Sequence, residues 1–454
     1  MFNVDRNIIL TEDGINLVKL KEITKKFISD EVPNLKKLHD AYNREINDEI
    51  QVNMHKYITD TLVSYVVGIP VAYSNISTDL EDNYIIAEED SENYETAKLC
   101  SIYGRAFEYL YIDEDDNIAF TPLETMNTFI IKSNDIVPKN LIGCYYTETY
   151  DIKGNLEQVT LLCYTADRCY KYTGKDIDGL QLAEEEEHYF GGIPILELLN
   201  NNEAIGDFVD VMGLIKAYET LQTDRLHDKN AFINKLLVVI NSSLGDTDEE
   251  VAYSRNVLKK GGILELEDID ANCKSDAKFI SQTFDEANVE TLKKSLLQDI
   301  MRISRCPDLS SEDAFAGNTS GIAMKYHLLN TELIGQTKER FMIRFLRNRI
   351  NLINNIYSLK GKGFDASVID INFTRNIPTS KEELLQELQA TEGILSLETR
   401  LMRYDSELDV KEEMKKLQAE KENNMKLVEN SFGNYHYNTT TEINEDEDNN
   451  EEDN

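Results

Sequence analysis

The sequence predicts an α+β protein that is mainly helical. Residues 11 to 62 place apolar side chains at helical spacing, with few Gly or Pro residues to interrupt them. Residues 100 to 172 instead contain short aromatic and β-branched runs separated by turn residues, which is typical of antiparallel strands. Helical periodicity returns in long stretches after residue 206. The chain of 454 residues is long enough for two or more sizeable buried cores.

The first half therefore predicts helices followed by strands. The opening helical face is formed by Ile15, Leu17, Val18, Leu20 and Ile23. The expected strands are the runs FEYLYI, NTFII, IGCYYTETY and VTLLCYT. We expect GGIPI, residues 191 to 195, to end the strand region. This half is thus predicted to be a mixed α and β domain.

Two long helices are expected to flank a compact insertion. The first follows the polar run NNNEAIGD, with Asp207 at its N-cap, and continues for about eight turns to Leu236. The runs LLVVI and GGILELE, on either side of a short helix over 249 to 259, predict a small α/β unit. The second long helix runs from Asp285 to about Ser304 and ends before Pro307.

A loop and a third long helix come next. Residues 307 to 321, PDLSSEDAFAGNTSG, have the composition of a loop. The helix then runs from about residue 322 to 359, with Gly335 as an expected bend point. After a short strand at VIDIN, helices are expected over 379 to 432, and the carboxylate-rich residues 433 to 454 predict a disordered acidic tail.

The net charge is strongly negative, at −37 from 84 acidic and 47 basic residues. Such a balance argues against a protein that grips nucleic acid through a broad basic surface. The sequence contains neither a run of about 18 apolar residues nor a basic, apolar signal sequence, so we expect a soluble protein that is not exported. The six cysteines form no C-x-x-C pair, and we expect them to be reduced, small buried residues.

No enzyme motif is convincing. The tripeptides GKD at 174 to 176 and GKG at 361 to 363 lack the upstream glycine and the hydroxyl residue of a phosphate-binding loop, and the six histidines form no H-E-x-x-H motif. We therefore expect no catalytic residue, no cofactor and no metal.

A near match to a calcium loop also carries little weight. Four of its positions are occupied by Asp113, Asp115, Asn117 and Glu124. However, Ile118 stands where the sharp turn needs glycine, and the flanking runs are strands instead of helices. A hairpin turn is the favoured interpretation.

Four segments, in order along the chain, carry a resemblance to a known family. They are VSYVVGIPVAY at 63 to 73, IYGRAFEYLYIDEDDNIAFTPL at 102 to 123, GGIPILELLNNNEAIGDFVDVMGLIKAYETLQTDRLHDKNAF at 191 to 232, and SGIAMKYHLLNTEL at 320 to 333. From about residue 10 to 430 the chain resembles the portal proteins of tailed bacteriophages, of the type found in siphophages of Gram-positive hosts. The resemblance implies a ring-shaped homo-oligomer, usually of twelve subunits.

The portal fold implied by this resemblance has a mixed α/β wing, long stem helices, a small α/β clip, a kinked tunnel helix and a helical crown. The implied boundaries are 1–205 for the wing, 206–235 for the first stem helix, 236–283 for the clip, 284–306 for the second stem helix, 307–320 for the tunnel loop, 321–359 for the tunnel helix, 360–378 for the return to the wing, 379–432 for the crown and 433–454 for the acidic tail.

The resemblance also implies a function and partners. The ring would form a non-enzymatic channel at one capsid vertex for DNA packaging, DNA ejection and head-tail joining. Its expected partners are other copies of itself, the double-stranded DNA in the channel, the terminase large subunit, a head-completion adaptor at the clip, and the major capsid and scaffolding proteins, with no membrane. Its expected location is the virion, and the host cytoplasm during assembly.

Particular residues follow from this assignment. The tunnel-loop residues near DNA would be Asp308, Ser310, Ser311, Glu312, Asp313 and Asn318. Lys293 and Lys294 are candidates for a DNA-facing stem. Arg340, Arg344, Arg347, Arg349, Phe341 and Phe345 are candidates for the subunit interface, because an acidic ring needs cationic partners for its carboxylates. An ordinary exposed loop and an ordinary helix core are the simpler alternatives.

Two other functions stay open. A nucleic-acid-processing enzyme such as a nuclease would need a divalent metal and would lose activity when one carboxylate is replaced. Another capsid or scaffolding component would form shells or stay elongated, without making closed rings.

Overall fold

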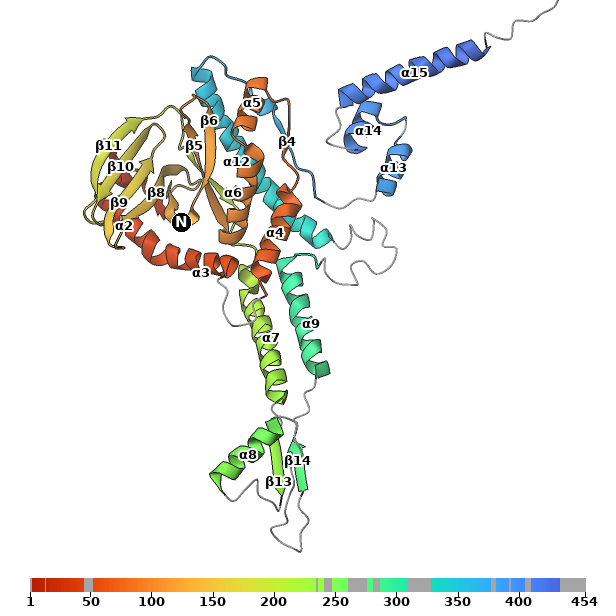
Figure 1. Cartoon of the computed structure of the whole chain (residues 1–454). Helices are drawn as coiled ribbons and strands as arrows, with labels where there is room; N and C mark the ends of the chain where they lie inside the picture. Colours follow the sequence, from red (N-terminus) through yellow and green to blue (C-terminus); the bar gives the residue numbers. More distant parts are fainter. Residues whose placement is uncertain are drawn as a thin grey trace, which may run out of the picture. The chain divides into compact units, whose positions relative to one another are not determined.

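The computed structural model describes residues 2–12, 14–44, 52–233, 236–240, 247–259, 276–280, 286–308, 328–376, 381–391, 393–404 and 410–432. The chain divides into two compact units, Met1–Ile377 and Pro378–Asn454. Helices and strands are mixed in the first unit, and helices form the described part of the second (Figure 1). The predicted mainly helical α+β class is confirmed as a mixture of helix and sheet.

A larger sheet of six strands forms one side of the first unit. Its order is β1-β7-β8-β9-β10-β11, and β1 alone pairs in parallel in the described sheet. The strands are β1 (Phe2–Val4), β7 (Thr128–Ser133), β8 (Asn140–Tyr150), β9 (Leu156–Tyr164), β10 (Arg168–Gly174) and β11 (Gln181–Glu187). The predicted strands in NTFII, IGCYYTETY and VTLLCYT are confirmed as β7, β8 and β9.

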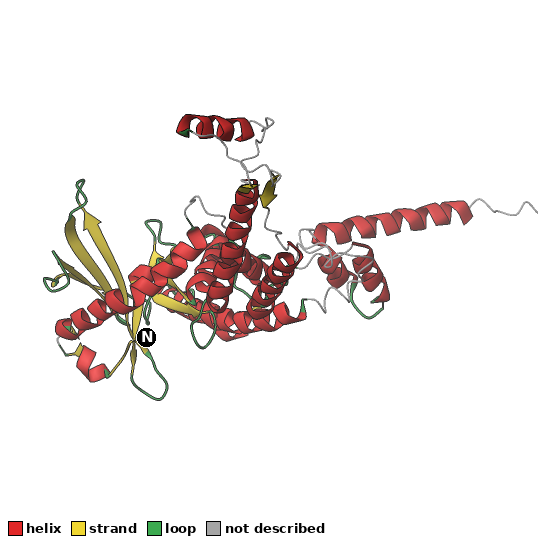
Figure 2. Ribbon diagram, turned by 90° about the horizontal axis from the view of Figure 1, so that it is seen from below, coloured by secondary structure: helices red, strands yellow, loops and turns green. Residues whose placement is uncertain are grey.

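The opening helices pack against this sheet. They are α1 (Arg6–Ile9), α2 (Leu17–Lys26), a π-helical turn (Phe27–Glu31) and α3 (Val32–Asn43), with the short pair β2 (Leu10–Thr11) and β3 (Gly14–Ile15) between α1 and α2. Leu20 and Phe27 share one apolar core with Phe129 and Ile142 of the sheet. Figures 1 and 2 show α2 and α3 lying beneath the sheet in the orientation of Figure 1.

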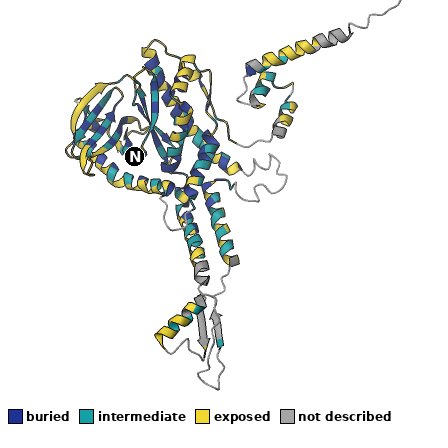
Figure 3. Ribbon diagram, in the orientation of Figure 1, coloured by how far each residue is buried: buried dark blue, intermediate teal, exposed yellow. Residues whose placement is uncertain are grey.

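A smaller sheet, β12-β5-β6, is covered by helices on one face. Its strands are β5 (Arg105–Ile112), β6 (Ile118–Leu123) and β12 (Ile195–Leu199). Ala106, Leu110, Phe120 and Leu198 pack from this sheet into a core with α12 (Leu329–Leu359). Phe107 and Ile195 point to the other face, where they meet Ile130 of the larger sheet. Figure 3 shows the buried residues concentrated where the helices meet this smaller sheet.

The helical layer also contains α4 (Met54–Val67), α5 (Thr78–Ile86) and α6 (Glu89–Tyr103). A short pair, β4 (Ala72–Ser74) and β15 (Asp370–Asn372), follows α4 and returns the chain from α12 to this layer. A 3-10 turn at Thr125–Asn127 and another at Ala366–Val368 complete the described elements here. The β5–β6 connection is the predicted hairpin turn, in which the Asp113 carboxylate accepts from the backbone N–H groups of Asp115 and Asn117.

Two long helices leave this body side by side. They are α7 (Met212–Ile233), preceded by a 3-10 turn at Val209–Val211, and α9 (Glu286–Ser304). An ion pair of 3.0 Å from Arg225 Nη1 to Glu290 Oε2 joins them partway along their length. Between them in sequence stand β13 (Leu236–Ile240), α8 (Asp248–Lys259) and β14 (Asp276–Ile280), with β13 and β14 paired antiparallel (Figure 1). The predicted order of long helix, strand, short helix and long helix is confirmed, but Leu236 belongs to β13 and not to α7. The predicted strand GGILELE lies outside the described residues.

Two local predictions were wrong. The run GGIPI does not end the strand region, because β12 begins at Ile195 and pairs with β5. Asp207 does not cap the first long helix, because the 3-10 turn begins at Val209 and the α-helix at Met212. Gly335 lies inside the continuous helix α12, where an added Cβ would stand 3.2 Å from the Tyr65 ring, so a close approach explains this glycine. A bend there stays a prediction.

The second unit contains α13 (Lys381–Ala390), α14 (Leu397–Tyr404) and α15 (Val410–Phe432). Within this unit, α14 contacts both α13 and α15. The predicted acidic tail, 433 to 454, lies outside the described residues.

Replacement of Gly104 should destabilise the first unit more than replacement of Gly154. Both glycines have positive φ, +82° and +81°, so each alanine variant pays about 1–2 kcal/mol for the left-handed backbone. At Gly104, which ends α6, the new Cβ would also stand 2.1 Å from the Ala204 carbonyl oxygen, whereas nothing lies within 4 Å at Gly154. Denaturant unfolding should give G104A a loss above about 3 kcal/mol. Equal losses in the two variants would contradict this packing.

Candidate functional site

The predicted tunnel-loop residues fall largely outside the described chain. This applies to Ser310, Ser311, Glu312, Asp313 and Asn318. Asp308 is described and half-buried. The ends of this segment are held close together, because Thr331 Oγ1 at the start of α12 donates 2.8 Å to the carbonyl oxygen of Arg305. Contact between this segment and DNA stays a prediction.

The two stem lysines differ in their surroundings. Lys293 Nζ lies 3.5 Å from Glu290 Oε1, the same carboxylate group that pairs with Arg225 of α7. Lys294 is exposed. The structure therefore gives Lys293 a place in the contact between α7 and α9, and a DNA-facing role for either lysine stays a prediction.

Four elements meet at the carboxylate of Asp207, just before α7. Asn200 Nδ2, at the end of β12, donates 2.8 Å to Oδ1, and Ser101 Oγ of α6 donates to Oδ2. Lys338 Nζ of α12 lies 2.6 Å from Oδ2, and the side chain of Asp207 is only 1% exposed. This ion pair anchors the start of the α7 helix to the helical layer, which explains why Asp207 is not available as a helix cap.

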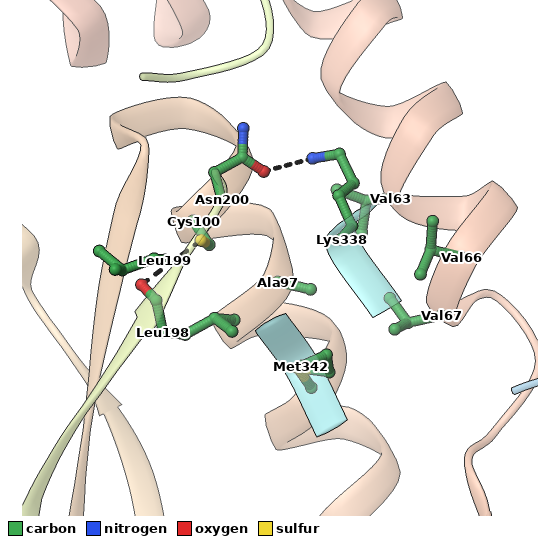
Figure 4. Close-up of a pocket in the computed structure, with 10 residues that line it drawn as sticks. All are labelled: Val63, Val66, Val67, Ala97, Cys100, Leu198, Leu199, Asn200, Lys338 and Met342. Atoms are coloured by element: carbon green, nitrogen blue, oxygen red, sulfur yellow. Dashed lines mark hydrogen bonds between the residues drawn. The ribbon is translucent and has the colours of Figure 1, made fainter. Parts of the chain in front are cut away.

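One pocket next to this junction, between α4 and α12, is small and apolar. Figure 4 shows Val63, Val66 and Val67 of α4 facing Met342 and Lys338 of α12 across it. Its volume is about 30 Å³, so it has room for no more than about one water and is not a substrate site. Its one thiol, Cys100, donates to the Leu198 carbonyl oxygen at 3.5 Å, and burial raises the pKa of that thiol, so it is no nucleophile.

A buried histidine packs just before the start of α7. The ring of His55 in α4 meets the ring of Phe208 edge-on, with centroids 5.0 Å apart. Its Nδ1 has no hydrogen-bond partner among the described residues. Burial, together with the charge of Arg44, lowers the pKa of His55 to about 4. The neutral ring is therefore part of the apolar packing at neutral pH.

One face of α12 is buried through a charged cluster. Arg349 Nε donates 2.8 Å to Glu108 Oε1 of β5, its Nη2 donates to Glu108 Oε2, and its Nη1 lies 3.2 Å from Glu89 Oε1 of α6. The guanidinium carbon also lies 4.1 Å from the centre of the Phe120 ring. Arg349 and Glu108 are both 0% exposed.

Electrostatics in this cluster favour an ionised arginine. Burial raises the pKa of Glu108 and of Glu89, and the charge of Arg349 opposes both increases. Burial by itself would lower the pKa of Arg349, but the charge of Glu108 and its hydrogen bonds raise it. The fork of the guanidinium therefore supplies charge and hydrogen bonds to two carboxyls that have little or no contact with water.

The burial of this face corrects the predicted role of two interface candidates. Arg349 and Phe345 are 0% and 2% exposed within their own chain, so the prediction that they contact a neighbouring subunit was wrong. Sequence reasoning also missed the buried ion pairs of Asp207 with Lys338 and of Glu89 and Glu108 with Arg349. A signal existed for Glu108, which alternates with the buried Ala106 and Leu110 in an aromatic strand.

The opposite face of α12 carries the other predicted arginines. Arg340, Arg344 and Arg347 are exposed, and none makes an ion pair with another residue that the structure describes. The guanidinium of Arg344 lies over the ring of half-buried Phe341, 5.7 Å from its centre. Their place on an exposed helix face is consistent with an interface, which stays a prediction.

The described residues show no sign of a metal centre. Within the described ranges, no three His, Cys, Asp or Glu side chains gather closely enough to hold an ion. The described cysteines are free, with Cys100, Cys144, Cys163 and Cys306 buried and Cys169 half-buried, and Cys273 lies outside the described ranges. Within the described residues, no helix has the length and hydropathy that a membrane span requires.

Comparison with known proteins gives one assignment. The family model described as phage portal protein, SPP1 Gp6-like, matches residues 18–427. The match covers most of the first unit, including both long helices, and most of the helices of the second unit. No curated protein matches the chain.

Stability should fall in mild acid because of His55. Its folded pKa of about 4 lies below the usual value of about 6.5, so the unfolded state binds the proton first as the pH drops. The contribution of neutral His55 to the free energy of unfolding is therefore present above pH 6.5. It is lost as the pH falls towards 4, by up to about 3 kcal/mol. Urea unfolding of wild type and His55→Gln between pH 8 and 4 should show a shallower pH slope in the variant. Parallel slopes would exclude His55 as the cause.

Removal of Arg349 should be far more damaging than removal of an exposed arginine of the same helix. Arg349→Met leaves two buried carboxyls unpaired, which should cost about 3–5 kcal/mol of unfolding free energy. Arg340→Met, the matched control, should change it by less than about 0.5 kcal/mol. Adding Glu108→Leu to Arg349→Met should recover part of the loss. Similar stabilities for Arg349→Met and Arg340→Met would refute the importance of the cluster.

Proposed function

Because the chain belongs to the SPP1 Gp6-like phage portal proteins, we propose that it forms a closed ring around a DNA channel at one vertex of a phage capsid. In this proposal the ring serves DNA packaging, DNA ejection and head-tail joining. It contains twelve subunits, as is usual for the family. The proposal extends the family assignment to the particular assembly and to the passage of DNA through it.

The observation that carries this proposal is the pair of long helices α7 and α9. They are joined to each other by Arg225 and Glu290, and α7 is tied to the mixed α/β body through Asp207 and Lys338. In sequence they enclose the small unit of β13, α8 and β14. A subunit that lines a channel and presents a tip needs three parts. These are a body, two long helices that pack side by side, and a small unit between those helices in sequence.

The parts then take the following roles. Residues 1 to 205 form the wing, α7 and α9 the stem, residues 236 to 283 the clip, α12 the tunnel helix, and residues 379 to 432 the crown. The clip would meet a head-completion adaptor, and the wing and crown would meet capsid and scaffolding proteins. The subunit would act in the host cytoplasm during assembly and afterwards in the virion.

The charge of the chain suits a channel through which DNA must slide. Each cation that contacts a phosphate releases counterions and adds a salt-sensitive binding contribution. A subunit with a net charge of −37 offers few such traps. Members of this family are structural and in general not enzymes, so we assign the packaging motor to a separate protein, the terminase large subunit, working against this ring.

Electron microscopy of the purified chain tests the proposal. The sample should be imaged at several concentrations and at raised salt, which screens repulsion between acidic subunits. We expect closed rings with a central hole of roughly 20 Å or more, wide enough for duplex DNA. Monomers or compact dimers under every condition would contradict self-assembly into a channel.

A nuclease assay serves as the control for the enzyme alternative. Duplex and single-stranded DNA should stay intact with the protein in the presence of Mg²⁺ or Mn²⁺. Metal-dependent cleavage that copurifies with the chain and disappears when a single carboxylate is replaced would favour the nuclease alternative instead.

A further inference from the structure

A cavity of about 260 Å³ lies among β4, α5 and α6. Tyr73 and Tyr84 form aromatic walls, with ring centroids 5.2 Å apart and planes tilted by 54°. Glu81, Glu89 and Asp90 add three carboxyl groups to its lining. Aromatic faces beside carboxylates are the surroundings that a guanidinium prefers, because it can stack on rings and donate to carboxylates at once.

Tyr84 lines the cavity, but its hydroxyl is buried. The residue is 6% exposed, and the hydroxyl has almost no accessible surface and makes no hydrogen bond to the described residues. Burial raises the pKa of Tyr84, which keeps this hydroxyl protonated. A side chain that enters the cavity would therefore meet the aromatic part of Tyr84 and not its hydroxyl.

The charge of the cavity is not balanced within the described chain. Glu89 is satisfied by Arg349, Tyr73 and Asn93. Glu81 and Asp90 are exposed at the rim and make no ion pair with another described residue. Ile85, beside them, is 73% exposed. The rim therefore offers two free carboxylates next to an apolar side chain.

Cations that could pair with these carboxylates lie on the exposed face of α12, away from the cavity. Arg340, Arg344 and Arg347 follow one another at four and three residues, so they share one exposed face. Arg349 reaches Glu89 on the cavity side. At about 100° per residue, the three exposed arginines lie about 140° to 180° around the helix from Arg349. These three residues, the arginine stripe, therefore face away from the cavity of their own chain.

We propose that the cavity among β4, α5 and α6 receives the arginine stripe, Arg340, Arg344 and Arg347, of a second copy of this chain. The contact is head-to-tail, because cavity and stripe are different surfaces of one subunit, and such a contact closes a ring when its rotation divides a full turn. Insertion covers Ile85 and neutralises the rim carboxylates. The inference rests on the proposed ring and names the residues that build it.

Charge reversal tests the pairing. Glu81→Lys with Asp90→Lys reverses the rim, and Arg344→Glu with Arg347→Glu reverses the stripe. Each double variant should raise the protein concentration needed for half-maximal ring formation by at least about tenfold, measured by sedimentation velocity and electron microscopy. Thermal unfolding of the unassembled subunit should show at most a small loss, because the replaced side chains are exposed. Part of that loss is expected for the rim variant, since Glu81 and Asp90 lie in the first turns of α5 and α6, where a lysine opposes the helix dipole. Glu157→Lys and Arg6→Glu, exposed and distant in sequence, are the matched controls and should assemble normally.

The decisive experiment combines the two charge reversals, either in one chain or in a mixture of the two double variants. The quadruple variant pairs glutamates of the stripe with lysines of the rim and should recover ring formation. An equimolar mixture of the two double variants should also form rings, in which the variants alternate.

Three outcomes would overturn the inference while leaving the ring itself intact. They are normal assembly of both double variants, failure of a folded quadruple variant to assemble, and loss of DNA binding without loss of rings in the stripe variant, which would assign the arginines to DNA. Absence of rings in the wild type would instead contradict the proposed function, and this inference with it.

Discussion

The buried guanidinium of Arg349 constrains the arrangement of the whole helical layer. A charge removed from water is tolerated only with close, hydrogen-bonded partners, and here those partners come from β5 and α6. The rotation of α12 about its axis follows from this requirement, because the helix must present Arg349 to Glu108 and Glu89. The same rotation turns Arg340, Arg344 and Arg347 to the outside. One helix thereby serves the interior of the subunit with one face and is free for assembly with the other.

A second ion pair connects this arrangement to α7. Lys338 lies on α12 three turns before Arg349 and holds Asp207 at the base of α7. Helix α7, the smaller sheet and α12 are thus connected through two buried charge contacts. In a ring, this would make α12 the element through which a displacement of the stem reaches the subunit boundary. The small pocket beside Lys338 fits that mechanical role better than any chemical one.

Much of this fold was open to prediction because its signals are local. The alternating run FEYLYI gives β5, and the spacing of Val289, Leu292 and Leu296 gives α9. The missed features depend on residues far apart in sequence. Arg349 finds Glu108 across 241 residues, and Asp207, whose neighbours suggest a helix cap, is taken instead by Lys338 across 131 residues. Both contacts are tertiary ion pairs, and the one at Asp207 overrides the local preference for a helix cap. The pattern of residues along the chain does not indicate which carboxylate a basic side chain will meet.

The division of α12 into an inner and an assembly face is the central claim, and a side-chain-resolution cryo-electron microscopy map of the assembled protein tests it most directly. The account predicts density for Arg349 joined to Glu89 and Glu108 of its own subunit, and density for Arg340, Arg344 or Arg347 within the tyrosine-lined cavity of the next. A map in which the arginine stripe faces the channel or the solvent, with the cavity of the neighbouring subunit left open, would contradict it.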